Sequence, residues 1–421
     1  MPTSRPSAAP GCGCPESVSQ GISRRALLGG ALFGSLALAA GDAVTQVAFA
    51  DAGYTGDTLV VLSLRGGFDG LSAVAPIGDP AYRTLRPSIA VPSSSALAVG
   101  GVFGLHPALA PLMPLWRAGR LGAVQAVGMQ AANRSHFSAM EEMERAAPGT
   151  SLRTGWLDRM VGGTGSGSVF SAVQLGSSTL SPGLRGPNPE LGLRRLGDLS
   201  LKGSIKGEEG RWASALSAMH VGAPDAVAAP ARTALSAVTR VGQLASAPVV
   251  AGYPDSDLGT SLRELALLIR SDVGVRVAAV DVGDWDMHVG LGAAGQGWMR
   301  DKLDDLARSL AAFAADLGPA LDRTTLLTLS EFGRTLDENG SGGTDHGYGN
   351  AVLVLGGGVV GGKVHGRWPG LAPEARVGGD LAVTTDYRSL LTEALVKRCG
   401  LSASAVFPGQ VGSTSGVFRF R

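Results

Sequence analysis

Six short runs of this sequence are rich in apolar and β-favouring residues, and most of them are continuously apolar, which limits the folds open to the chain. Runs of this length without polar alternation are typical of strands covered on both faces. Amphipathic stretches separate them, so strands and helices alternate along the chain. This alternation predicts an α/β fold, a three-layer sandwich with a largely parallel central sheet and helices on both faces. The predicted strands are residues 58–64, 122–128, 169–174, 275–282, 324–330 and 351–356.

Helical spacing is clearest in the longest amphipathic stretch, where apolar side chains recur every three or four residues. The sequence shows no linker-like break, so residues 51–421 are predicted to form a single domain. Residues 175–260 are rich in Gly, Ser, Ala and Pro. We interpret them either as an insertion that caps one end of the sheet or as a surface excursion. The predicted helices are residues 106–118, 135–146, 259–272, 294–316 and 386–398.

The N-terminal segment has the pattern of an export signal. Arg24 and Arg25 directly precede an apolar run too short for a comfortable membrane span, and Ala48-Phe49-Ala50 forms a cleavage signal. We expect residues 1–50 to be a twin-arginine signal peptide that engages the twin-arginine export machinery and is cleaved after Ala50. The mature protein would then be periplasmic or secreted, with no stable membrane span. A plain secretory signal or an uncleaved anchor are the alternatives.

Charge and cysteine content narrow the possible partners and stabilising bonds. The net charge of +1 gives no electrostatic case for binding nucleic acid. Cys12 and Cys14 lie in the predicted leader, which leaves Cys399 alone in the mature chain. No internal disulfide is therefore expected.

Polar side chains with metal-binding or catalytic chemistry follow the predicted strands. In parallel α/β sheets, ligands bind beyond the carboxyl ends of the strands. Asp69 follows the first strand between glycines, where it binds a ligand or only stabilises a turn. Arg134, Ser135 and His136 lie where a helix begins after the second strand. Ser135 is interpreted either as the N-cap of that helix or as a nucleophile or metal contact.

Two more strand ends carry carboxylates and histidines. Asp284, Asp286 and His288 follow residues 275–282, as metal ligands or as a salt-bridged turn. After residues 324–330 come Glu331 and then a glycine-rich loop with Asp345 and His346. Four such strand ends together predict a site without thiolate ligands that binds Zn, Mn, Mg or Ca. The sequence lacks the G-x-S-x-G motif of an α/β serine hydrolase.

Several stretches together resemble the exported family catalogued as domain of unknown function 1501. They include "LVVLSLRGGFDGLSAVAPIGDPAYRTLRPSIAVP", "RSHFSAMEEME", "DVGDWDMHVG", "SEFGRTLDENGSGGTDHGYGNAVLVLGGGVVGGKVHGRWPGL" and "DLAVTTDYRSLLTEAL". That family is similar to the alkaline phosphatase and sulfatase superfamily. The resemblance implies an alkaline-phosphatase-like, metal-bearing sandwich that hydrolyses phosphate or sulfate esters.

The resemblance also implies roles for individual residues. Ser135 would be the nucleophile, with Arg134 as a candidate anion clamp. One metal ion would be held by Asp286, His288 and His346, and a second would face Asp69, Ser135 and Glu331. Asp284, Asp345 and His136 are further candidates. The superfamily usually has Asp-His where this chain has Ser330-Glu331, so this chain has one imidazole fewer at that position.

The sequence therefore predicts an exported, metal-dependent hydrolase of small anionic esters. The alternative is a non-catalytic exported protein that binds a metal or an anion on the same fold.

Overall fold

A computed structural model describes residues 54–131, 133–165, 168–201, 209–245, 250–409, 412 and 416–421. They belong to one compact unit of the chain. The predicted leader, with its arginine pair and the cleavage after Ala50, lies outside the described residues. Within the part of the chain that is described, no helix combines the length and the apolar character needed to cross a bilayer.

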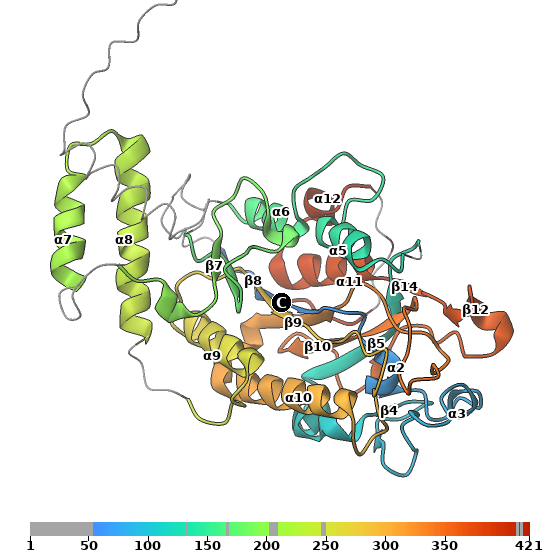
Figure 1. The fold of residues 1–421 in the computed structure, drawn as a ribbon. Helices are drawn as coiled ribbons and strands as arrows, with labels where there is room; N and C mark the ends of the chain where they lie inside the picture. Colours follow the sequence, from blue (N-terminus) through green and yellow to red (C-terminus); the bar gives the residue numbers. More distant parts are fainter. Residues whose placement is uncertain are drawn as a thin grey trace, which may run out of the picture. The chain divides into compact units, whose positions relative to one another are not determined.

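A nine-stranded sheet forms the middle of this unit (Figure 1). The central strand β1 (Thr58–Leu64) pairs in parallel with β8 on one side and β9 on the other. The order is β11-β5-β10-β9-β1-β8-β6-β7, and β14 also pairs with β5. Only β10 runs antiparallel to its neighbours. The other strands are β5 (Leu121–Gly128), β6 (Ala172–Leu175), β7 (Leu191–Leu193), β8 (Val277–Val282), β9 (Thr324–Leu329), β10 (Asn350–Gly356), β11 (Val364–His365) and β14 (Thr385–Asp386).

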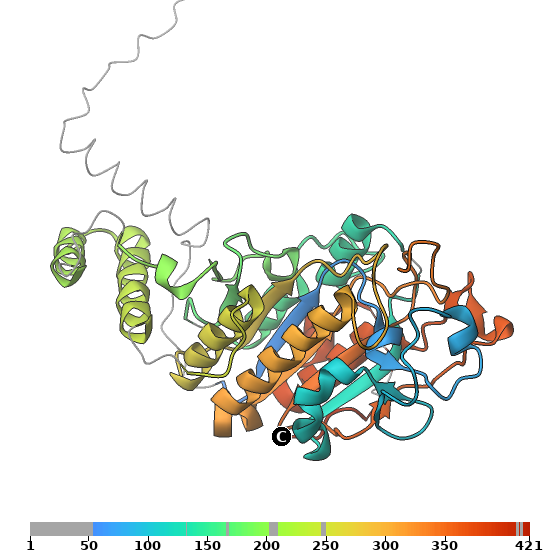
Figure 2. The same cartoon turned by 60° about the horizontal axis from the view of Figure 1, so that its bottom comes forward.

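Helices cover both faces of the sheet, which explains why its strands are largely apolar. In β1, Val60 and Leu62 pack in the core shared with α9 (Asp257–Arg270) and α10 (Trp298–Leu317). Their neighbours Leu59 and Val61 pack in the opposite core. Figure 2 shows α9 and α10 lying across one face of the sheet. The second core includes residues of α5 (His136–Arg145), α6 (Trp156–Gly163) and α11 (Tyr387–Ala394). The predicted three-layer α/β fold is confirmed.

Smaller elements complete the unit. Two short additional sheets have the strand orders β2-β4-β3 and β12-β13. The segment predicted as an insertion supplies the edge strand β7 and two helices, α7 and α8. The remaining elements are α2 (Gly70–Ala73), β2 (Val74–Ala75), α3 (Tyr82–Leu85), β3 (Leu97–Ala98), β4 (Gly104–Leu105), η2 (Pro107–Leu112), α4 (Met113–Arg117), η3 (Pro182–Leu184), η4 (Leu196–Asp198), α7 (Glu209–Met219), α8 (Asp225–Ala245), η5 (Gly318–Arg323), η6 (Pro373–Ala375), β12 (Arg376–Val377), β13 (Asp380–Leu381), η7 (Leu395–Cys399) and α12 (Ala403–Val406).

Three predicted helices differ from the observed ones for local reasons. Residues 106–118 form the 3₁₀ turns of η2 and the short α4 because Pro111 and Pro114 cannot donate backbone hydrogen bonds. Helix α10 begins at Trp298 rather than at residue 294, since Gly297 at its N-cap has a φ of 101°. The last predicted helix ends at Ala394 and continues as a π-helical turn.

One edge of the sheet gathers the polar loops. Strands β1, β5, β8 and β9 run in the same direction, so their carboxyl ends lie at this edge. Because β10 runs the other way, it begins at the same edge. The loop before β10 therefore returns to the place where the loops after the other strands start.

Candidate metal centre

Three imidazole rings meet at this edge of the sheet. His136 is the first residue of α5, His288 follows β8, and His346 precedes β10. The Nε2 atom of His346 lies 3.0 Å from Nε2 of His136 and 3.1 Å from Nε2 of His288. The three side chains are 31%, 41% and 24% exposed, so the cluster is open to solvent on one side.

The carboxylate of Asp286 lies among these rings. Its Oδ1 is 2.9 Å from Nε2 of His288 and 3.2 Å from Nε2 of His346, and its Oδ2 is 3.5 Å from Nε2 of His136. Arg334 donates to the same Oδ1 at 2.6 Å. Partial burial acts to raise the pKa of Asp286, but the hydrogen bond and charge of Arg334 outweigh it and hold that pKa below its ordinary value. Ligating atoms of His136, Asp286 and His346 all lie within 4.8 Å of one another.

The second nitrogen of each ring is engaged by an acceptor. Nδ1 of His136 lies 2.8 Å from Glu331 Oε1, and Nδ1 of His288 lies 2.7 Å from Asp345 Oδ1. Nδ1 of His346 lies 2.8 Å from the carbonyl oxygen of Arg134. An ionised carboxylate and a carbonyl can only accept, so each Nδ1 carries the proton. With the proton on Nδ1, the other nitrogen, Nε2, is the ring atom that faces the cluster and can bind a metal.

This donor set fits a cation. Lone pairs and a carboxylate about 3 Å apart repel one another unless a proton or a cation lies between them. Ligand atoms bound at about 2.0–2.2 Å to one ion stand roughly 3–3.5 Å apart, which matches the separations of Asp286 from the three rings and of His346 from the other two rings. The orienting acceptors on Nδ1 are the usual outer partners of metal-bound histidines. Around the rings, the carboxylates of Asp286, Glu331 and Asp345 and one guanidinium, Arg334, leave a net charge of −2, the charge that one divalent ion neutralises.

Some predicted metal residues lie in the cluster itself, and others lie beside it as hydrogen-bond partners of its rings. Asp286, His288 and His346 lie together in the cluster. Glu331 and Asp345 reach the centre through His136 and His288, as hydrogen-bond partners of the rings. Glu331 is only 3% exposed and also accepts from the backbone N–H of Gly66 at 2.8 Å. Its position as an orienting carboxylate differs from the direct ligand role predicted for it.

Asp69 and Asp284 have other partners. Asp69 accepts from the backbone N–H of Leu71 at 3.2 Å and caps α2. Its other oxygen pairs with Arg86 Nη1 at 2.6 Å, and both side chains are buried. Asp284 is exposed and lies 3.3 Å from Lys302 Nζ. The geometry therefore gives both carboxylates roles in ion pairs rather than in the histidine cluster.

The two predicted catalytic residues lie beside the cluster. Ser135 is the exposed N-cap of α5 and makes no side-chain cap hydrogen bond, so its hydroxyl is not committed to the helix. The guanidinium of Arg134 pairs with Asp380, whereas its carbonyl oxygen faces His346. Arg134 therefore contacts the centre through its backbone.

Two residues of the centre, His136 and Arg334, were not among the main predicted ligands. His136 was only a further candidate, although it is one of the three histidines, of six in the chain, that lie at this sheet edge. Arg334 was not singled out. The available signal was an arginine within the loop between Glu331 and His346, next to the predicted ligands.

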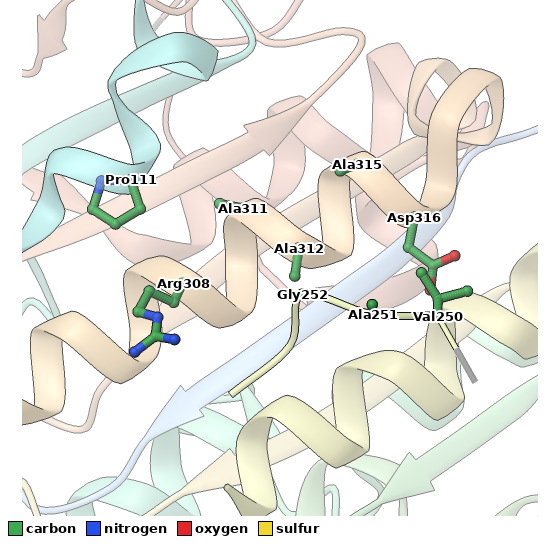
Figure 3. Close-up of a pocket in the computed structure, with 9 residues that line it drawn as sticks. All are labelled: Pro111, Val250, Ala251, Gly252, Arg308, Ala311, Ala312, Ala315 and Asp316. Atoms are coloured by element: carbon green, nitrogen blue, oxygen red, sulfur yellow. The ribbon is translucent and has the colours of Figure 1, made fainter. Parts of the chain in front are cut away.

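A separate cavity of about 380 Å³ lies along α10, between that helix, Pro111 and residues 250–252 (Figure 3). Its lining is largely apolar, with Arg308 and Asp316 as the charged residues. None of its lining residues belongs to the histidine cluster.

Comparison with solved structures finds distant likenesses. A sulfatase from Pseudoalteromonas sp. is 13% identical, with a TM-score of 0.37 and coverage of 94% of this chain and 77% of that one. A phosphonate monoester hydrolase of Agrobacterium radiobacter is 11% identical, with a TM-score of 0.36 and coverage of 85% and 78%. An alkaline phosphatase superfamily protein from Vibrio parahaemolyticus is 10% identical, with a TM-score of 0.34 and coverage of 76% and 68%. At these values, the likenesses assign no function to this chain.

Comparison with protein families is more decisive. Among curated proteins, no sequence matches this one. The family model described as "Protein of unknown function (DUF1501)" matches residues 115–398, a span that contains β5, β8, β9 and β10 and all three clustered histidines. The family resemblance drawn from the sequence is thereby confirmed. Because the match covers more than half of its length, this chain belongs to the DUF1501 family.

Proposed function

We propose that this protein is an exported hydrolase of phosphate or sulfate esters that depends on one divalent metal ion. The observation that carries the proposal is the convergence of three Nε2 atoms on Asp286 with every Nδ1 held by an acceptor. The choice of phosphate or sulfate esters rests on the superfamily resemblance of the sequence.

The ligand chemistry favours zinc among the four metals considered. His136, His288, His346 and Asp286 offer three imidazole nitrogens and one carboxylate. Imidazole suits zinc, whereas magnesium and calcium prefer oxygen ligands. A single ion is proposed because Asp69, which would have faced a second one, is neutralised by the buried Arg86.

The proposed reaction uses Ser135 as the nucleophile. Its oxygen would form a bond to the phosphorus or sulfur atom while the ester bond breaks and the alcohol departs with a proton. Water would then cleave the seryl ester and restore the hydroxyl. When bound, the metal ion would supply positive charge to the transferring oxygens. Glu331 and Asp345 would hold the rings of His136 and His288 in place.

The decisive experiment combines metal analysis with an ester panel. Purified protein is measured for zinc per chain and for turnover of phosphate monoesters, phosphate diesters and sulfate esters. We expect one zinc per chain and turnover that a chelator removes. Ser135→Ala should lose turnover and keep zinc. Ser138→Ala is the matched control, because Ser138 is an exposed serine of the same helix that only accepts a bond from Asn133.

A second function, metal or anion binding without catalysis, follows from one feature of the site. Ser135 is exposed, and within the described part of the chain its hydroxyl makes no cap hydrogen bond that would fix its direction toward the cluster. Stoichiometric zinc with no turnover of any ester would favour this function. Full turnover by Ser135→Ala would instead remove the assignment of the nucleophile.

Export by the twin-arginine route belongs to the same proposal. Replacing Arg24 and Arg25 together by lysine should retain the precursor in the cytoplasm, as measured by cell fractionation. N-terminal sequencing of the exported protein should begin at Asp51. Export that is insensitive to the paired replacement would point to the general secretory route.

A further inference from the structure

We infer that Arg334 is a positioning residue that sets the orientation of Asp286 as a metal ligand. This inference rests on the proposed metal centre but not on the identity of the substrate. Arg334 lies in the loop between β9 and β10, and its side chain is fully buried while Asp286 is 44% exposed. A buried guanidinium beside a half-exposed carboxylate fixes that carboxylate from the protein side.

The contacts of Arg334 connect three separate segments. Nη1 donates to Asp286 Oδ1 at 2.6 Å and to the carbonyl oxygen of Gly66 at 3.2 Å. Nε donates to Thr344 Oγ1 at 3.3 Å, and Nη2 donates to the carbonyl oxygen of Thr344. One planar group therefore ties the loop after β1, the loop after β8 and the loop before β10. The fixed fork of the guanidinium makes this arrangement directional.

This anchoring has a consequence for metal binding. Oδ1 of Asp286 receives the Arg334 bond and also faces the Nε2 atoms of His288 and His346. Without Arg334, the carboxylate could rotate about χ2, which is a soft torsion. The guanidinium also offsets one of the three surrounding negative charges. Loss of the guanidinium should weaken metal binding because the carboxylate of Asp286 is no longer held in one orientation. This effect opposes the electrostatic one, since removing a positive charge favours a cation.

Arg86 provides a matched control within the same structure. It is also fully buried, it pairs with an aspartate at 2.6 Å, and it donates to the carbonyl oxygens of Thr335 and Leu336 in the same loop. Its aspartate, Asp69, does not contact the histidine cluster. Replacing Arg86 thus removes a buried arginine that pairs with an aspartate and anchors the same loop, without touching a proposed ligand.

The experiment measures zinc affinity by chelator competition, together with the visible absorption spectrum of the cobalt-substituted protein. Arg334→Met is expected to weaken zinc binding by about 10–100-fold and to alter the cobalt spectrum. Arg86→Met should lower the melting temperature but keep the zinc affinity within about threefold, because substitutions at sites that share no partners act independently. Arg334→Lys should recover only part of the affinity, because an ammonium cannot span the same acceptors.

The outcomes separate this inference from the proposed function. Wild-type protein that binds no zinc would refute the metal centre itself. Zinc binding that is lost equally in Arg334→Met and Arg86→Met would show that Arg334 acts only through general stability. Unchanged affinity and spectrum in Arg334→Met would also overturn the inference. Should Arg334→Met fail to fold, Arg334→Lys carries the same comparison against Arg86→Lys.

Discussion

Single side chains at the sheet edge are held by hydrogen bonds between residues far apart in sequence. Glu331 accepts from the N–H of Gly66, 265 residues earlier, and from the ring of His136, 195 residues earlier. Ser330 donates to the remaining carboxylate oxygen at 3.1 Å. A buried carboxylate with three such donors has little freedom to move, so the imidazole it holds is oriented before any metal binds.

Glu331→Gln tests this orienting role. The amide keeps an acceptor for Gly66 and His136 but loses the negative charge that makes the ring a stronger ligand. Zinc affinity should fall about 10–100-fold, measured by chelator competition. Glu338→Gln is the control, because Glu338 lies in the same loop and accepts only from the backbone of Ser88 and Ile89. Equal losses in the two variants would argue against an orienting role.

A second buried acid, Glu190, should make stability depend on pH. Burial, and then the charge of Asp158, raise the pKa of Glu190 to about 9. Its Oε1 finds no hydrogen-bond partner among the described residues. The folded state therefore keeps the proton while the unfolded chain releases it near its ordinary pKa of about 4.5. Stability from this group is complete below about pH 4.5 and is lost progressively as the pH rises toward 9.

Glu190→Gln should remove this loss. The free energy of unfolding of the variant is expected to match wild type near pH 4.5 and to exceed it by roughly 4–5 kcal/mol at pH 8, as measured by urea unfolding at both pH values. Glu374→Gln, at an exposed site, serves as the control. A variant with the same pH slope as wild type would mean that Glu190 is ionised in the folded protein.

At the scale of elements, the loop between β9 and β10 brings ligands to the centre by packing its backbone tightly. A Cβ at Gly343 would lie 2.3 Å from the carbonyl carbon of His288, and one at Gly347 would lie 2.3 Å from the carbonyl carbon of Arg334. Only glycine permits these approaches. The glycines that read as turn residues in the sequence therefore allow the loop to lie against the segments that carry His288 and Arg334.

Gly343→Ala should disturb the centre from the backbone side. The added methyl group must displace His288, so we expect a loss of about 1–3 kcal/mol in stability and weaker zinc binding. Gly340→Ala is the matched control in the same loop, because its Cβ would meet nothing within 4 Å. Thermal unfolding and chelator competition on both variants check the prediction. Equal behaviour of the two variants would contradict the close approach.

At the scale of the whole molecule, the centre joins segments that follow or precede four strands and one helix. Metal binding should therefore stabilise the folded chain as a unit. A ligand at 100 times its Kd adds about 2.7 kcal/mol to the free energy of unfolding. Zinc should raise the melting temperature by a few degrees, and a chelator should reverse the rise. His346→Ala should abolish the response, whereas a zinc response that survives in this variant would place the ion elsewhere.

Much of the fold could be predicted from local pattern. The first strand was predicted at residues 58–64 and spans Thr58–Leu64 in the structure, since a run in which every residue but Ser63 is apolar or β-favouring leaves few alternatives. The helix boundaries were less predictable where prolines and glycines intervene. The antiparallel direction of β10 was not predictable, because direction depends on how a strand pairs across the sheet rather than on its own residues.

Local sequence determined which residues form buried strands and which polar side chains stand at the strand ends, because burial and backbone preference depend on near neighbours. Tertiary structure alone decided the partner of each carboxylate. Asp69 pairs with Arg86, while Asp286 meets Arg334 and the histidines. Both aspartates follow a strand of the sheet, and only the folding of distant loops onto one edge separates a helix cap from a candidate metal ligand. The physical reason is that electrostatic pairing depends on distance in space, which no local pattern encodes.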